Sequence, residues 1–142
     1  METLELTMAQ QVAEVASEFQ EQRTGHTPTA VTVVLSGDTV VVTLHGALSP
    51  AEQALARSPE GAAKVQEFHR RLFASSSELL REEITKITGV PVHEAAAEVE
   101  TATGTVVHVF ASGTMIQVFQ LARNVPAGAW IGNGSGGPQR KA

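Results

Sequence analysis

The chain contains no cysteine and no tyrosine, and only one of its 142 residues is tryptophan. Without cysteine, the fold has no disulfide, no cysteine-ligated zinc and no thiol nucleophile. Aromatic residues make up only 4% of the sequence, whereas hydrophobic residues as a whole make up 42%. The core must therefore be built from valine, leucine, isoleucine and alanine, and a chain of this length is expected to form one domain around it.

The sequence also lacks an excess of basic residues and a long apolar run. Its formal net charge is −5, which argues against nucleic acid as a partner, because such binding depends on neutralising phosphates. A membrane-spanning helix needs about 20 apolar residues in succession, and the N-terminal residues include acidic side chains without the apolar region of a signal peptide. We therefore expect a cytoplasmic protein that does not insert into a membrane.

Residues 30–45 predict a β-hairpin whose register can be derived. The segments AVTVVLS and TVVVTLH flank Gly37-Asp38, and this dipeptide is typical of a two-residue hairpin turn. Such a turn places three apolar pairs on one face of the hairpin: Leu35 with Val40, Val33 with Val42, and Val31 with Leu44. The opposite face is lined by threonine and valine, so we expect it to be partly covered or only half exposed to water.

Helix signals lie on both sides of this hairpin. An amphipathic pattern predicts a helix over residues 3–22, which Gly25 ends. After the hairpin, Ser49-Pro50-x-Glu52 forms a capping box with proline at the first helical position, and a short helical turn follows. A second start signal at Ser58-Pro59 begins a long helix over about residues 59–88, which ends before Gly89.

A second hairpin is predicted around a three-residue loop at 102–104, pairing Val99 with Val107 and Glu98 with His108. A last strand over 115–121 follows, and residues 123–142 are expected to form a flexible, glycine-rich tail to a single domain of residues 1–122. The order of elements predicts an α+β fold, in which two hairpins form an antiparallel sheet. The N-terminal helix and the long helix cover one face of that sheet.

The length of the second helix favours a homodimer. Thirty helical residues span about 45 Å, whereas the seven-residue strands span about 24 Å. An apolar stripe that continues beyond the sheet needs another surface, and a second copy of the chain is the simplest one. We expect the interface near the C-terminal half of the helix, with these candidate residues: Leu79, Leu80, Ile84 and Ile87.

Residues capable of chemistry are scattered. The five histidines, at positions 26, 45, 69, 93 and 108, lack the spacing of a metal motif, so we expect no metal, no cofactor and no catalytic residue. Glu98 and His108 suit an acid–base pair or, more often, a cross-strand ion pair. The basic residues Arg23, Arg70 and Arg71 suit an anion site or, more often, a solvated surface.

One family shares the pattern of these elements. The hairpin and corner RTGHTPTAVTVVLSGDTVVVTLHGALSPAEQALARSPEG, the helix with Arg70-Arg71, and the later segments ITGV and TGTVVHVF together resemble the MpsC-like domain. The resemblance covers about residues 5–111, and its most specific part is the hairpin with the corner that follows. The family commonly has an acidic residue before the second hairpin turn, and here Glu98 stands at that position.

The family takes its name from a sodium-translocating, membrane-potential-generating system, of which the domain is a small soluble component. The resemblance implies an association with cation or bicarbonate transport and supplies no catalytic residues. Our leading interpretation is a non-enzymatic accessory protein that binds a membrane transport complex. The alternatives are a small-molecule or anion sensor using Arg23, Arg70 and Arg71, and, with less support, a small enzyme using Glu98 and His108.

Overall fold

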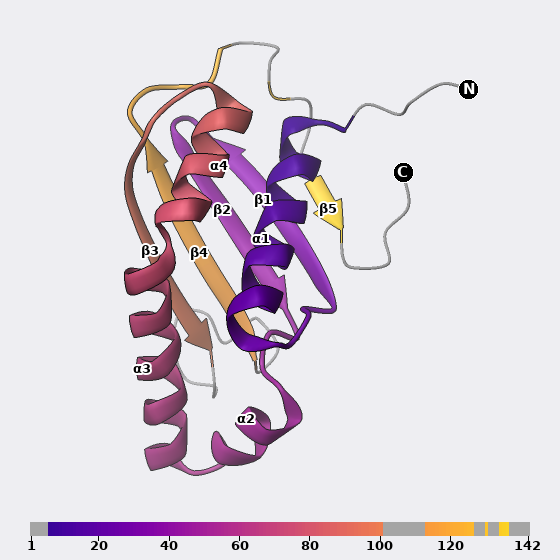
Figure 1. The fold of residues 1–142 in the computed structure, drawn as a ribbon, viewed down its shortest axis with the longest axis vertical. Coiled ribbons are helices and arrows are strands. Elements are labelled where there is room, and N and C mark those ends of the chain that lie inside the picture. Colours follow the sequence, from indigo (N-terminus) through magenta and orange to yellow (C-terminus); the bar gives the residue numbers. More distant parts are fainter. Residues whose placement is uncertain (1–5, 101–112, 127–129, 131–133, 137–142) are drawn as a thin grey trace, which may run out of the picture.

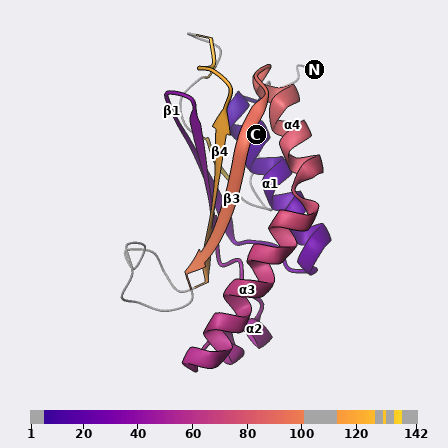
Figure 2. The ribbon, with the colours of Figure 1, turned by 90° about the vertical axis from the view of Figure 1, so that its left-hand side faces the viewer.

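The computed structural model describes residues 6–100, 113–126, 130 and 134–136. The strands form one antiparallel sheet in the order β3-β4-β2-β1-β5. The larger helices cover a single face of it (Figures 1 and 2). The predicted α+β class is therefore confirmed. In chain order, the elements are α1 (Met8–Thr24), β1 (Ala30–Ser36), β2 (Thr39–His45), α2 (Pro50–Leu55), α3 (Pro59–Ser76), α4 (Glu78–Thr88), β3 (Val92–Glu100), β4 (Thr114–Leu121) and β5 (Gly134–Gly136).

The first hairpin has the predicted register. Leu35 pairs with Val40, and Val33 pairs with Val42. Gly37, with φ of 63°, occupies the left-handed region that the two-residue turn requires. The helix-facing side chains of both strands lie in the core, where all except the half-buried Leu35 are fully buried. The opposite face consists of valine, threonine and serine at alternate positions, with the pair Ala30 and His45 at the end of the hairpin away from the turn.

The N-terminal helix begins later than the sequence indicates. Thr7 Oγ1 accepts a hydrogen bond from the Gln10 N–H at 3.1 Å, and Gln10 Oε1 accepts one from the Thr7 N–H at 2.9 Å. This reciprocal cap fixes the start of α1 at Met8. Gly25, with φ of 77°, ends the helix as predicted. The helix packs against β1, β5 and α4.

The prediction of one long helix is wrong, because the helix breaks at Ser77. Ser75 and Ser76 both donate side-chain hydrogen bonds to the Leu72 carbonyl. Such bonds compete with the helical backbone and bend it. The break redirects α4 so that it packs against α1 and β3. As a result, Leu80 and Ile84 are covered within the same chain.

The predicted second hairpin lies partly outside the described residues, so it stays a prediction. In the structure, Val99 pairs with Met115 and Glu98 with Ile116, so the described partner of β3 is β4. Residues 101–112, which include Val107 and His108, lie outside the described residues. Turn signals in the sequence are local, so they do not show which strands pair with β4. In the structure, β4 lies between β3 and β2 in the middle of the sheet, and its Phe119 is buried.

The C-terminal segment is not only a tail. Its described residues include β5, whose Ser135 pairs with Thr32 at the free edge of β1. Val125 and Trp130 are partly buried against the core. A strand of Gly-Ser-Gly can add to a sheet edge because pairing uses backbone donors and acceptors, which glycine supplies like any other residue. The prediction of a flexible tail over 123–142 is therefore wrong for these residues.

The helix α2 and the first half of α3 project beyond the end of the sheet (Figures 1 and 2). They are joined tightly, because a Cβ atom added to Gly61 would lie 1.8 Å from the Leu55 carbonyl oxygen. The Ser58 side chain caps α3 through the Gly61 N–H at 3.0 Å. Both helix starts that the sequence predicts, at Ser49 and at Ser58, are present.

The contact at Gly61 can be tested with a single methyl group. Helix propensity alone would make Gly61→Ala more stable by about 1 kcal/mol. We expect a net loss of about 1–3 kcal/mol instead, because the added methyl overpacks against backbone. Urea denaturation of Gly61→Ala checks this. The matched control is Ala63→Gly, at an exposed position of the same helix, which should lose only about 1 kcal/mol. A more stable Gly61→Ala variant would contradict the tight junction.

Candidate functional site

The carboxylate of Glu52 holds two elements together. Its Oε1 accepts a hydrogen bond from the Ser49 N–H at 2.9 Å and thereby completes the capping box of α2. Its Oε2 lies 2.7 Å from Nε2 of His69 on α3. The sequence predicts the first role of Glu52 but not the second. Each carboxylate oxygen therefore has its own partner, and α2 is fastened to the middle of α3.

His69 is fully buried, at 0% exposure, although it directly precedes Arg70 and Arg71 in the sequence. It occupies the inward stripe of α3 together with Val65 and Phe73, at intervals of four residues. A histidine between two apolar residues at that spacing is the signal by which the sequence could have placed it inside. Phe68 and Leu72 are also apolar, but they lie on the outward side of the helix.

The environment of Glu52 favours its charged form. Burial raises the pKa of the carboxyl, but the hydrogen bonds from the Ser49 backbone and from His69 outweigh it and hold the pKa below the ordinary value of 4.5. Glu52 is therefore a carboxylate at neutral pH and accepts from both donors. The His69 ring can meet it as the Nε2–H tautomer, which leaves Nδ1 directed elsewhere in the core.

A second buried polar residue lies at the same level of the core. The rings of Phe73 on α3 and Phe119 on β4 are 5.9 Å apart, and both elements run in the same direction (Figure 1). His69 precedes Phe73 by about 6 Å of helix, and Gln117 precedes Phe119 by about 7 Å of strand. Among the described residues, neither Nδ1 of His69 nor the side-chain amide of Gln117 has a hydrogen-bond partner.

This buried polar group is shielded from substrates. Neither His69 nor Gln117 has exposed surface, so in this conformation neither of them can meet a dissolved molecule. The Glu52 side chain keeps 20% of its surface exposed, and its contact with His69 holds α2 in place. The described residues contain no group of three or more potential metal ligands. Two of the remaining histidines make local contacts, His26 with the Gly46 carbonyl and His45 with Thr32.

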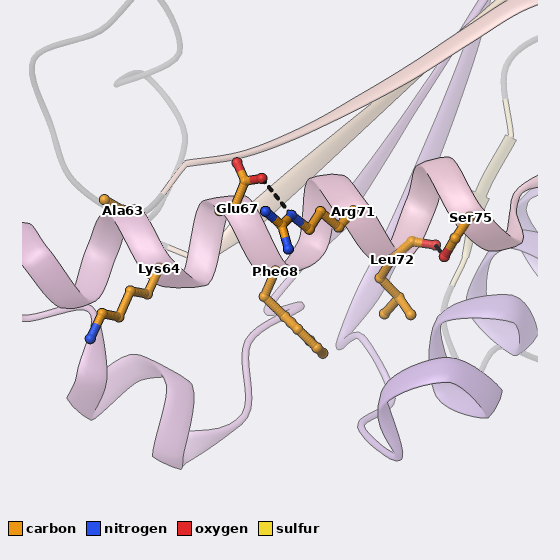
Figure 3. Close-up of a pocket in the computed structure, with 7 residues that line it drawn as sticks. All are labelled: Ala63, Lys64, Glu67, Phe68, Arg71, Leu72 and Ser75. Atoms are coloured by element: carbon orange, nitrogen blue, oxygen red, sulfur yellow. Dashed lines mark hydrogen bonds and ion pairs between the residues drawn. The ribbon is translucent and has the colours of Figure 1, made fainter.

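The outward side of α3 presents a shallow groove of about 610 Å³, which we call the α3 groove. Phe68, Leu72 and Arg71 line it, and Figure 3 shows Phe68 and Leu72 projecting from the same side of the helix. Phe68 is 51% exposed, and the neighbouring Leu55 of α2 is 50% exposed. This apolar surface runs along the outward side of α3 from Ala63 to Ser75.

The three arginines of the anion-sensor hypothesis do not meet at one site. Arg70 and Arg71 both pair with Glu67, each at 2.8 Å. The hydrogen bond from Arg71 is the main cause that lowers the pKa of Glu67. Arg23 instead lies over the Phe19 ring, 4.7 Å from its centroid, and lines a separate groove between α1 and α4. Glu67 thus offsets the charge that an anion would require.

The structure places only some of the other predicted site residues. Glu98 stands opposite Ile116 in the sheet, and His108 lies outside the described residues. Of the four residues expected at a dimer interface, Leu80 and Ile84 are core residues at 2% and 0% exposure. Ile87 is half-buried and only Leu79, at 58%, is well exposed. The stripe that seemed to need a second copy is covered mainly by α1 and β3.

The Glu52 contacts predict a pH-dependent contribution to stability. Because the pKa of Glu52 is lowered in the folded state, the unfolded chain binds a proton first as the pH falls. The stabilisation is therefore complete above about pH 4.5 and is lost as the pH falls through the lower, folded-state pKa. Glu52→Gln removes one of the two acceptors and should cost about 1.5–3 kcal/mol at pH 7.

Urea denaturation of wild type and Glu52→Gln between pH 7 and pH 3 measures this difference, which should shrink toward the acid end. Glu60→Gln, an exposed residue in the first turn of α3, removes the same charge and should change stability by less than about 0.5 kcal/mol. A Glu52→Gln difference that stays constant down to pH 3 would show that the carboxylate does not carry the effect.

Comparisons with known proteins found a family match and a relative. The family described as "Na+-translocating membrane potential-generating system (MpsC)" matches residues 5–113. An uncharacterised protein of Bacillus subtilis (strain 168), YbcI, is 28% identical over 100 residues, which cover 70% of this chain and 81% of that protein. No solved structure matches the chain. Within the described residues, no helix combines the length and apolarity needed to cross a bilayer. Because the match extends over most of the sequence, the chain belongs to the MpsC family.

Proposed function

We propose that the protein is a cytoplasmic accessory component of a sodium-translocating, membrane-potential-generating system, and that it acts by binding a membrane-embedded subunit rather than by catalysis. Membership of the MpsC family supports the link to such a system, since the family is described by it. The observation that carries the binding role is the exposed apolar surface of the α3 groove and the adjoining α2.

This surface has the composition of a docking site. Phe68 and Leu55 are each about half exposed, and burying a large apolar side chain contributes about 1.5–3 kcal/mol. Lys64, Glu67 and Arg71 border the groove with charges of both signs. Apolar centres with polar rims are typical of protein interfaces, and aromatic and arginine residues are the side chains that most often dominate their energies.

The position of the surface also suits a partner of large size. The groove lies on the outward side of α3, and the helices cover one face of the sheet (Figure 2), so a bulky complex can approach the groove without meeting the sheet. The Glu52–His69 pair and the Gly61 contact fix α2 and α3 relative to each other. The surface is therefore preorganised, which reduces the entropy lost on binding.

The test is a comparison of Phe68→Glu with wild type. Phe68 is exposed, so a charge there should leave the fold intact while weakening binding at least tenfold, given that a central interface residue contributes about 2 kcal/mol or more. Tagged protein is added to detergent-solubilised membranes, and retained integral-membrane subunits of the sodium-translocating system are quantified by mass spectrometry. In a strain lacking the protein, the sodium-dependent membrane potential should be restored by wild type and not by Phe68→Glu.

Leu79→Glu is the matched control, because Leu79 is equally exposed but lies on α4, away from the groove. It should retain the membrane subunits and restore the potential. If Phe68→Glu behaves like Leu79→Glu in both assays, the α3 groove is not the docking surface. If wild type retains no subunit of the system, the accessory role is wrong.

A further inference from the structure

The lining of the α3 groove has the pattern of a helix-packing surface. Its residues form two neighbouring rows along α3, and within each row the spacing is four positions. One row is Lys64, Phe68 and Leu72, and the other is Ala63, Glu67, Arg71 and Ser75. Figure 3 shows the first row projecting from one side of the helix. Residues four positions apart form the ridges of a helix surface, and the groove between two such ridges accepts a ridge of another helix.

The shape of the groove favours an extended partner over a small molecule. From Ala63 to Ser75, α3 spans about 18 Å, and the side chains that line the groove all belong to this one helix. A site for a small molecule usually encloses most of the surface of its ligand, which one side of a single helix cannot do. An amphipathic helix needs to bury only one apolar stripe, so the geometry favours a helical segment of a larger protein.

The charge around the groove differs in sign from that of the whole chain. The formal net charge of the protein is −5, yet residues 57–75 contain four basic residues and only two acidic ones. All six are exposed: Arg57, Glu60, Lys64, Glu67, Arg70 and Arg71. Glu67 pairs with both Arg70 and Arg71, so its single charge offsets only one of them. The remaining positive charge is spread along the helix, which suits a row of carboxylates better than one small anion.

We propose that the segment of the membrane-embedded subunit that binds in the α3 groove is an acidic amphipathic helix. This inference rests on the proposed function, in which that subunit docks at the groove. The apolar side chains of the partner helix pack on Phe68 and Leu72, as in other complexes where a helix lies in a groove. Its carboxylates face Lys64 and Arg71, and this charge complementarity speeds association and selects the partner. A basic helix would meet the same cations and be rejected.

Two neighbouring side chains give opposite predictions. Arg71→Gln removes a cation from the groove, whereas Glu67→Gln removes its carboxylate and frees both arginines. Tagged protein is titrated against detergent-solubilised membranes, and the apparent Kd for the subunits of the system is measured. Arg71→Gln should weaken binding by about threefold and Glu67→Gln should strengthen it by about threefold, because exposed charge pairs make modest contributions.

Lys86→Gln is the matched control, since Lys86 is an exposed cation on α4, outside the α3 groove, and the apparent Kd should not change. If Arg71→Gln strengthens binding, or if Glu67→Gln weakens it or leaves it unchanged, the partner segment is not acidic and the proposal is wrong.

A carbodiimide cross-link tests the contact directly, because this reagent joins a lysine amine to a carboxylate and does not act on arginine. In the wild-type complex, Lys64 should be linked to an aspartate or glutamate of a membrane subunit. Mass spectrometry should place that carboxylate in a segment whose apolar residues recur every three or four positions. Lys64→Arg should bind equally well and lose the link. A retained subunit without a Lys64 link, or a link to a segment that lacks this periodicity, would overturn the proposal.

These outcomes can be told apart from a failure of the proposed function. If subunits are retained through Phe68 without the opposite charge effects or the Lys64 link, the docking role stands and only the acidic helix is wrong. If no subunit is retained, both fall. Vesicles of phosphatidylglycerol and phosphatidylcholine test an anionic bilayer as the occupant, and wild type should not float with them. Flotation that Phe68→Glu abolishes would show that the groove binds lipid and would overturn the proposal.

Discussion

The arrangement of the helical layer depends on one carboxylate. Glu52 ends the corner after the first hairpin, and it binds both the backbone of its own helix and the buried ring of His69. A buried histidine is costly unless its polar atoms are paired, so the pair fixes both the position of α2 and the rotation of α3. That rotation decides which side chains of α3 enter the core, and Phe68 and Leu72 are left outside as a consequence.

The parts of the fold that are determined locally could be predicted from the sequence. The register of the first hairpin follows from a two-residue turn, and the capping boxes and terminal glycines follow from backbone groups within a few residues of each other. The parts set by tertiary contacts could not. The break at Ser77 becomes stable because α4 packs against α1, which is distant in the sequence. Likewise, β4 pairs with β2, which comes much earlier in the chain, as well as with β3, the strand directly before it.

The candidate site shows the same division. The sequence predicts an apolar stripe on the long helix, but α3 carries apolar residues on two sides, and hydrophobicity alone does not show that His69 is buried and Phe68 is exposed. Histidine is ambiguous in such patterns because its burial depends on a distant partner, here Glu52, which is 17 positions earlier. The arginines were grouped by charge, whereas the structure separates Arg23 from the pair that Glu67 neutralises.

The central position of β4 has a consequence for how the chain folds as it is synthesised. The family match ends at residue 113, yet the strand that joins β2 to β3 begins at Thr114. Until that strand leaves the ribosome, the first hairpin and all four helices are already available while one edge of β2 remains without its partner. Pairing between distant segments is slow, and an open strand edge attracts other chains. The nascent protein is therefore most prone to aggregate in the interval before β4 emerges.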